Sequence, residues 1–205
     1  MLTTRERFGV TFAALFAAGL RNRASAMMRK GITETGLPET MFAELCLHLS
    51  LLLGFPAMLD GLARLREITP RKDAIEPLRD RNRDSHKRGM QTLRTIYGTA
   101  LPRLMTNLES LHAIVPDIIL RDVYGKIISR PGLSLREREL VNVAVLSIQG
   151  LDDQLFSHLR GALRVGVPAG ALREVIRGSA KLARTDSRQP LKMLSTLTNS
   201  KEKTR

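Results

Sequence analysis

The sequence predicts an all-α protein made of two tandem related units. Hydrophobic residues make up 43% of the 205 residues and aromatic residues only 4%, with no tryptophan. This aliphatic composition suits packed helices better than β-sandwiches. No stretch alternates polar and apolar residues for long enough to indicate a strand. An internal repeat, described next, indicates that one helical arrangement occurs twice along the chain.

The repeat relates the start of the chain to its central stretch. Leu2–Leu20 aligns without gaps on Leu133–Leu151, an offset of 131 residues, and nine of the nineteen positions are identical. Further along, GLPETMFAEL at Gly36 matches GVPAGALREV at Gly166 with an offset of 130. The two offsets differ by one, so the repeat needs only one inserted or deleted residue between these blocks. We interpret it as a duplicated helical unit.

The first unit, residues 1–68, is expected to contain helices over residues 5–18, 21–30 and 38–53. Pro38 suits the first turn of the third helix. The Gly54-Phe55-Pro56 sequence should break that helix, and a fourth helix is expected over residues 57–68. The opening residues also resemble a signal peptide, but arginines interrupt the approach to the supposed cleavage site. We therefore interpret them as a folded helix.

Residues 69–88 are predicted to be a linker, because they combine two prolines with dense mixed charge. The second unit, residues 89–185, should begin with helices over residues 89–97, 102–111 and 116–128. Helices over residues 135–149 and 152–165 are then expected to form a hairpin about Gly150, with Ser134 and Glu137 as a capping box. Residues 186–205 are expected to be a partly disordered tail.

The central hairpin carries one polar residue on each apolar face. Glu139 precedes Val143 and Leu146 at helical spacing, and His158 lies among leucines on the next helix. If the two helices fold back on each other, Glu139 and His158 approach within about one turn. Such a pair can act in acid–base chemistry. Helical spacing alone favours the alternative, a buried hydrogen bond that only satisfies two polar groups.

Charge and cysteine content limit the other classes of function. The formal net charge is +13, but basic and acidic residues are interleaved and no nucleic-acid-binding motif is present, so nucleic-acid binding is not expected. The single cysteine, Cys46, excludes an internal disulfide framework and a CxxC site. This cysteine content fits a reducing, cytoplasmic compartment. No membrane span is expected, because the apolar run Phe8–Leu20 is too short. His48, near Cys46, is interpreted as a packed core residue rather than a metal ligand.

From Arg88 onwards the sequence resembles carboxymuconolactone decarboxylase-like proteins of the alkylhydroperoxidase AhpD-like superfamily. The strongest matches are YGKIISRPGL at Tyr124, SHLRGAL at Ser157 and the Gly-Val-Pro entry to the last helix of the unit. LTTRER, GLPETMFAEL and LSLLLGFPAMLDGL extend the resemblance to the first unit. The resemblance implies an AhpD-like helical bundle and a homo-oligomer, a trimer or hexamer, with sites between helices near subunit contacts.

The resemblance assigns roles to the central pair. Glu139 and His158 occupy the spacing of the Glu and His in the peroxidase motif of the superfamily, but the two cysteine positions fall on Leu151 and Gln154. Thiol peroxidase chemistry is therefore not expected. The decarboxylase branch needs neither metal nor organic cofactor. There His158 would donate a proton to the carbanion left by loss of carbon dioxide, and Glu139 would be its partner.

Four arginines are candidates to bind the carboxylates of a small substrate: Arg130, Arg136, Arg138 and Arg160. Arg160 points away from His158 on its helix and could join the site only across a subunit boundary; a surface ion pair is the alternative. Arg136 and Arg138 recur as Arg5 and Arg7 in the first unit, which favours a structural role for them.

The first unit lacks the pair, since the counterparts of Glu139 and His158 fall on Phe8 and on Met27 or Met28. Two functions stay open: a cofactor-independent lyase acting on a carboxylated lactone or enolisable acid, and a non-catalytic helical oligomeric or ligand-binding protein of the same fold.

Overall fold

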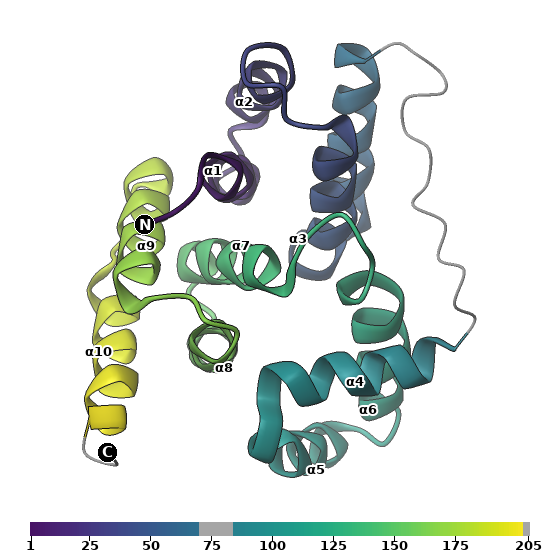
Figure 1. Cartoon of the computed structure of the whole chain (residues 1–205), viewed down its shortest axis with the longest axis vertical. Coiled ribbons are helices and arrows are strands. Elements are labelled where there is room, and N and C mark those ends of the chain that lie inside the picture. The colour runs from purple at the N-terminus through teal and green to yellow at the C-terminus, as the bar shows by residue number, and fades with distance from the viewer. Residues whose placement is uncertain (70–83, 203–205) are drawn as a thin grey trace.

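A computed structural model of the chain describes residues 1–69 and 84–202, and this part of the chain consists of helices and turns without a β-strand (Figure 1). The predicted all-α class is confirmed. The helices are α1 (Thr4–Ala17), α2 (Arg21–Thr33), α3 (Glu39–Ile68), α4 (Ser85–Tyr97), η1 (Gly98–Ala100), α5 (Leu101–Leu111), α6 (Val115–Ile118), η2 (Ile119–Ile128), α7 (Leu135–Gln149), α8 (Asp152–Arg164), α9 (Ala169–Ala183) and α10 (Arg188–Glu202).

Helices α1 and α7 both begin with a capping box. At α1, Thr3 accepts a hydrogen bond from the Glu6 amide while the Glu6 side chain accepts one from the Thr3 amide. At α7, Ser134 and Glu137 form the matching box. Each box satisfies two amide groups that a helix start leaves without partners. The capping box expected at Ser134 is therefore present, and its counterpart lies 131 residues earlier.

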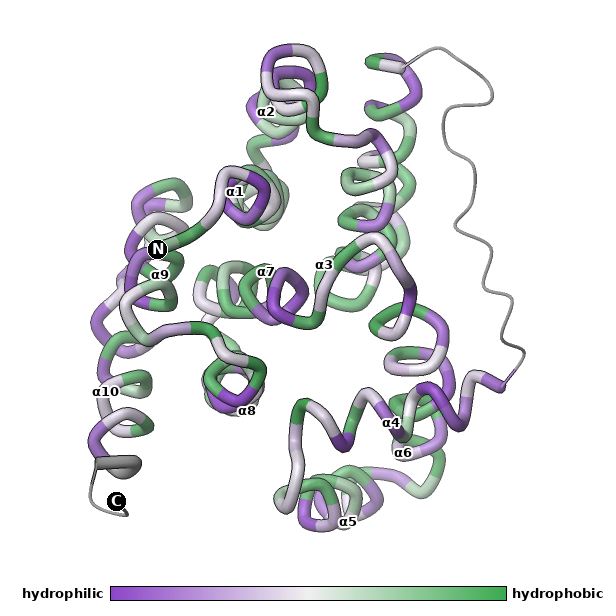
Figure 2. The backbone as a smooth tube through the Cα atoms, in the orientation of Figure 1, coloured by the Kyte–Doolittle hydropathy of each residue, from purple (hydrophilic) through white to green (hydrophobic). Residues whose placement is uncertain are grey.

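Helix α3 is bent at Gly54, whose φ of 81° and ψ of 169° are non-helical. Glycine adopts this conformation without the steric cost that a Cβ would bring. The break expected at Gly54-Phe55-Pro56 is confirmed, although the two halves continue as one long element. Figure 2 shows α3 as hydrophobic over most of its length. Among the described residues it alone has the length and composition of a membrane span, but its buried residues include Glu44 and His48, which is typical of a core helix.

Two glycines allow α4 and η2 to cross in close contact. A Cβ at Gly89 would collide with the Leu120 carbonyl, and one at Gly125 would collide with the Ser85 backbone. Segment η2 has π-helical hydrogen bonding over Ile119–Ile128, where the sequence predicted one continuous helix from Pro116. Stretches of π-helix frequently accompany functional sites. The α4–η2 layer packs against α8 and the centre of the molecule.

Helix α7 lies at the centre, surrounded by α1, α3, α8 and α9 (Figure 1). Its residues Val141 and Val145 belong to the apolar core of α1, α2 and α3, whereas Leu140 and Val143 belong to the core of α8, α9 and α10. A third cluster, which includes Ile96 and Tyr124, lies among α4, α5 and η2. Helix α7 thus contributes apolar side chains to both main cores, and the packing in both cores fixes its position.

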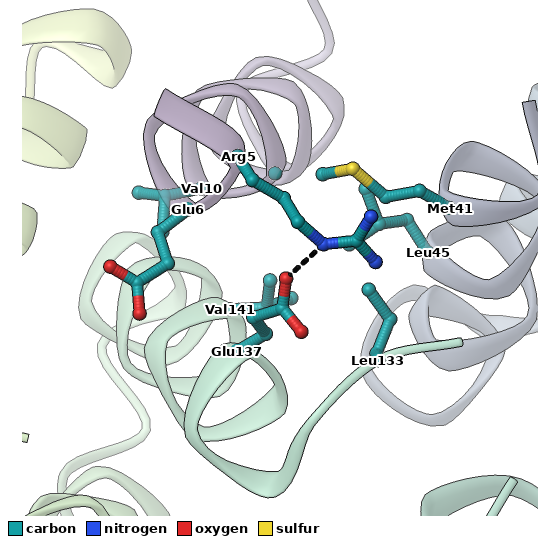
Figure 3. A pocket seen from close by; sticks show the side chains of 9 residues that line it. Arg5, Glu6, Val10, Met41, Leu45, Leu133, Glu137 and Val141 are labelled. Carbon is teal, nitrogen blue, oxygen red and sulfur yellow. Dashed lines mark hydrogen bonds and ion pairs between the residues drawn. The ribbon is translucent and has the colours of Figure 1, made fainter. Parts of the chain in front are cut away.

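Ion pairs between the units follow the repeat. Arg5 Nε lies 2.5 Å from Glu137 Oε1, and Arg136 Nε lies 2.6 Å from Glu6 Oε1. Because Arg5 corresponds to Arg136 and Glu6 to Glu137, the two contacts are reciprocal. Figure 3 shows the first of them beside a small, mainly apolar hollow between α1, α3 and α7. Each of the two aligned stretches thus supplies the arginine of one ion pair and the carboxylate of the other.

The boundaries of the units at residues 68 and 89 stay predictions. Residues 70–83 of the predicted linker lie outside the described residues, and Ser85–Arg88 are the first turn of α4. Where the sequence predicted a partly disordered tail from residue 186, the structure has α10, which packs against α8 and α9 through residues such as Leu194. The thin apolar stripe of this segment is sufficient because α10 covers one side only. Residues 203–205 lie outside the described residues.

Candidate active site

The α7–α8 hairpin brings Glu139 and His158 into direct contact. Gly150, in the left-handed conformation with φ 68°, ends α7 and reverses the chain. The Glu139 Oε2 atom lies 2.9 Å from His158 Nδ1. The Glu139 side chain is only 1% exposed, whereas that of His158 is 18% exposed. The contact expected from helical spacing is present, and the imidazole is the member of the pair that an outside molecule can reach.

Asn142 is a third member of the site that the sequence reasoning missed. It lies one turn after Glu139 on α7 and is 2% exposed. Its Nδ2 atom is 3.1 Å from His158 Nδ1 and 3.4 Å from Glu139 Oε1. The three-residue spacing from Glu139 was a visible indication, because residues at i and i+3 share a helix face.

His48 of α3 contacts the other side of the Asn142 amide. The His48 Nε2 atom lies 2.7 Å from Asn142 Oδ1, and Arg138 Nη1 lies 3.3 Å from His48 Nδ1. Complete burial and the neighbouring Arg138 guanidinium lower the pKa of His48 to about 3. His48 is therefore a neutral, packed residue at ordinary pH, as its position among leucines predicted, but it also connects two units.

Glu44 holds two of the predicted arginines. Arg130 Nε contacts both Glu44 carboxylate oxygens at 3.1 and 3.0 Å, with Nη2 at 2.7 Å from Oε1. Arg138 Nη2 lies 3.6 Å from Glu44 Oε2 and donates to the Arg130 carbonyl at 3.0 Å. Burial lowers the pKa of Arg138 to about 10, although Glu44 opposes this shift. Glu44, His48, Arg130, Arg138 and Asn142 form what we call the interior polar network.

The four predicted substrate-binding arginines are placed differently from one another. Arg130 and Arg138 contact Glu44, and Arg136 contacts Glu6 and donates to the Gly166 carbonyl at 2.9 Å. The structural role favoured for Arg136 and Arg138 by their recurrence agrees with these contacts. Arg160 is exposed on α8. A role of any of the four in substrate binding stays a prediction.

Helix α4 packs against α8 beside the pair, and η2 packs against α4. A Cβ at Gly161 would lie 2.8 Å from Ile96 Cγ2 and 3.1 Å from Glu139 Oε2, so this glycine allows α8 to approach both. The hydroxyl groups of Tyr97 and Tyr124 are 2.9 Å apart. Burial raises the pKa of Tyr97 to about 12 and that of Tyr124 well above its ordinary value, and the Glu139 charge contributes to both shifts. Both phenols therefore stay protonated at neutral pH.

In the first unit the corresponding positions hold apolar residues. Met28 is fully buried, and Phe8 and Met27 pack against the core of α1, α2 and α3. The hollow between α1, α3 and α7 and a surface hollow near Pro38 are not lined by Glu139 or His158. Within the described part of the chain, no group of three or more His, Cys, Asp or Glu side chains is arranged to hold a metal ion.

Comparison with known proteins agrees with the resemblance. A model of the carboxymuconolactone decarboxylase family matches residues 119–188, the stretch that contains Glu139, Asn142 and His158. The 4-carboxymuconolactone decarboxylase of Acinetobacter baylyi is 34% identical over 92 residues, which are 44% of this chain and 69% of that protein.

Two yeast proteins align over longer stretches. Peroxisomal protein 2 of Schizosaccharomyces pombe is 32% identical over 121 residues, 56% of this chain and 55% of that protein. Peroxisomal protein 2 of Saccharomyces cerevisiae is 29% identical over 169 residues, 69% and 59% of the respective chains. The chain thus spans little more than half the length of these two relatives. With the family model on the central hairpin and the match to the bacterial decarboxylase, the chain belongs to the carboxymuconolactone decarboxylase family.

Proposed function

We propose that the protein is a cofactor-independent lyase that acts on a small carboxylated lactone or enolisable acid, with His158 as proton donor and Glu139 as its partner. The observation that carries the proposal is the 2.9 Å contact between a buried carboxylate and a partly exposed imidazole. A carboxylate on Nδ1 holds the ring in one orientation and leaves the other ring nitrogen, Nε2, to meet a substrate. The family relationship supports the same reaction type.

The chemistry requires two functions from the site. Loss of carbon dioxide breaks the bond between the carboxylate carbon and the neighbouring carbon, and the electron pair passes to the adjacent carbonyl as an enolate. His158 then delivers a proton from Nε2 to that carbon, while Glu139 holds the ring through Nδ1. The phenols of Tyr97 and Tyr124 stay protonated, with their hydroxyl groups 2.9 Å apart, and either is a candidate hydrogen-bond donor to the enolate oxygen.

The carboxylate groups of the substrate need a cation outside the interior polar network. Arg160 is the exposed arginine of the predicted set, on the helix that carries His158. In the proposed homo-oligomer, a trimer or hexamer, Arg160 would face the site of a neighbouring subunit, because residues two apart on a helix point about 200° apart.

One observation favours a second candidate, a non-catalytic oligomeric or ligand-binding protein of the same fold. The hollows between α1, α3 and α7 and near Pro38 are not lined by the pair, and the first unit carries Phe8 and Met28 at the matching positions. On this alternative, the Glu139–His158 contact only satisfies two polar groups in the interior.

The two candidates are separated by assaying decarboxylation of 4-carboxymuconolactone with the purified wild-type protein, His158→Ala and His86→Ala. His86 is exposed on α4 and serves as the matched control. The lyase proposal expects turnover in wild type and His86→Ala, and a loss of at least about 100-fold in folded His158→Ala. Folding is checked by circular dichroism. Absence of turnover in the wild type removes this substrate, and equal turnover in all three proteins removes His158 from the mechanism.

A further inference from the structure

We infer that His48 and Asn142 are positioning residues: His48, supplied by the first unit, fixes the Asn142 amide so that its NH2 group faces Glu139 and His158. The inference rests on the function proposed for that pair and adds to it. It is carried by three contacts that join α3, α7 and α8: 3.3 Å from Arg138 to His48, 2.7 Å from His48 to Asn142, and 3.1 Å from Asn142 to His158.

The direction of the first hydrogen bond follows from the chemistry of arginine. A guanidinium group donates hydrogen bonds and never accepts them. The His48 Nδ1 atom beside Arg138 Nη1 must therefore be the acceptor, without a proton. Full burial next to a cation keeps the imidazole neutral, so its single proton is on Nε2. Arg138 in turn is held by Glu44 and by the Arg130 carbonyl, so the guanidinium cannot turn away.

The second step fixes the amide. Because His48 Nε2 carries the proton, it donates to the Asn142 atom at 2.7 Å, which must be the carbonyl oxygen Oδ1. The Asn142 nitrogen then faces the opposite way, toward Glu139 and His158. Without His48 the amide could rotate by 180° and present its oxygen to the Glu139 carboxylate, which would be repulsive.

The third step concerns how the Asn142 amide acts on the Glu139–His158 pair. While His158 holds its Nδ1 proton and donates to Glu139 Oε2, Asn142 donates to the other carboxylate oxygen, Oε1. The Asn142 Nδ2 atom also lies 3.1 Å from His158 Nδ1, so the amide contacts both members of the pair. The amide thereby fixes the Glu139 carboxylate that holds Nδ1, which keeps the ring in one orientation while Nε2 delivers its proton.

The network has no counterpart at the aligned positions of the repeat. The counterparts of His48 and Asn142 in the repeat are Gly178 and Thr11, which lack an imidazole and an amide. The first unit lost or never had the Glu–His pair, yet it contributes the residue that orients the pair of the second unit. Its contribution to function is thereby larger than that of an apolar support.

The test uses histidine-15N-labelled full-length protein and long-range 15N–1H correlation spectra, with His48→Gln, His48→Leu, Asn142→Leu and the control His86→Gln. Spectra of wild type at pH 7 should show His48 as the neutral tautomer with its proton on Nε2. The His158 ring signals should shift in His48→Leu and in Asn142→Leu. They should return toward wild type in His48→Gln, since a glutamine amide can accept from Arg138 and donate to Asn142.

The kinetic arm measures kcat and KM for 4-carboxymuconolactone in the same proteins. A positioning role lowers kcat on the order of tenfold in the Leu variants with little change in KM, and His48→Gln recovers most of it. A proton on Nδ1 of His48 in the wild type overturns the inference without any variant having to fold. Unchanged His158 signals in both folded Leu variants also overturn it. If wild type shows no turnover, the lyase proposal loses this substrate while the spectra still decide the positioning role.

Discussion

Replacing Glu44 by glutamine tests how much free energy of unfolding depends on the interior polar network. Glu44 contacts Arg130 and Arg138, and the side chains of Glu44 and Arg138 are 4% and 0% exposed. Glutamine keeps the size of the side chain but removes its charge, which leaves a fully buried guanidinium without a carboxylate. Removing one partner of a buried ion pair costs about 3–5 kcal/mol, because the remaining charge stays desolvated.

The repeat supplies a matched control for this substitution. Arg7 and Glu174 occupy the positions that correspond to Arg138 and Glu44 and also form an ion pair, but their side chains are 49% and 37% exposed. Solvent screens an exposed pair, so Glu174→Gln should cost only about 0–1 kcal/mol. The same Glu→Gln substitution is thus made at two related sites whose side chains differ mainly in burial.

The measurement is urea unfolding followed by circular dichroism, at one protein concentration for all variants, with the free energy extrapolated to water. In thermal unfolding a loss of about 3–5 kcal/mol corresponds to a midpoint lowered by about 6–20 °C for a chain of this size. Equal losses in Glu44→Gln and Glu174→Gln, or a loss under about 1 kcal/mol in the former, would refute the argument from burial.

Three further outcomes are expected. Gly161→Ala should lower the free energy of unfolding by about 1–3 kcal/mol, because its Cβ would lie 2.8 Å from Ile96 and 3.1 Å from Glu139. Gly170→Ala, whose Cβ meets open space, should be neutral or stabilising when both variants are unfolded by heat. A larger loss in Gly170→Ala than in Gly161→Ala would contradict this packing. The free energy of unfolding should fall as pH is lowered from 6.5 toward about 3, because His48 takes up a proton in the unfolded state but not in the folded one. In His48→Gln the free energy of unfolding should depend less steeply on pH over this range. The same pH dependence in both proteins would refute this explanation. Burial raises the pKa of the Cys46 thiol to about 12, so an aromatic disulfide reagent at pH 8 should label it only after unfolding, and rapid labelling of the native protein would be inconsistent with its environment.

Local patterns predicted the parts of the site that lie close together in sequence. Glu139 and His158 are nineteen residues apart on two adjacent helices joined by one turn, so helical spacing and the glycine at position 150 were sufficient to bring them together. The cap at Ser134 and the break at Gly54 are equally local, since both depend on the conformation of one or two residues.

The interior polar network could not be predicted because it depends on how α3 packs against α7. His48 and Asn142 are 94 residues apart, and Arg130 and Glu44 are 86 apart. Helical periodicity places each of them on a buried face but does not say which helix covers that face. The same reason applies to Arg130, Arg136 and Arg138, whose carboxylate partners Glu44 and Glu6 come from the first unit. The π-helical bonding of η2, which crosses α4 in close contact, is also absent from the pattern.

The packing of α1 also affects how the protein is made on the ribosome. Leu2 and Val10 belong to the apolar core of α7 to α10, and Arg5 pairs with a residue 132 positions later. At 5–20 residues per second, between about 7 and 26 s pass before Glu137 follows Arg5 out of the synthesis site. During that time one face of α1 has no partner. A nascent first unit should therefore be a substrate for chaperones, and it should aggregate when it is expressed without the second.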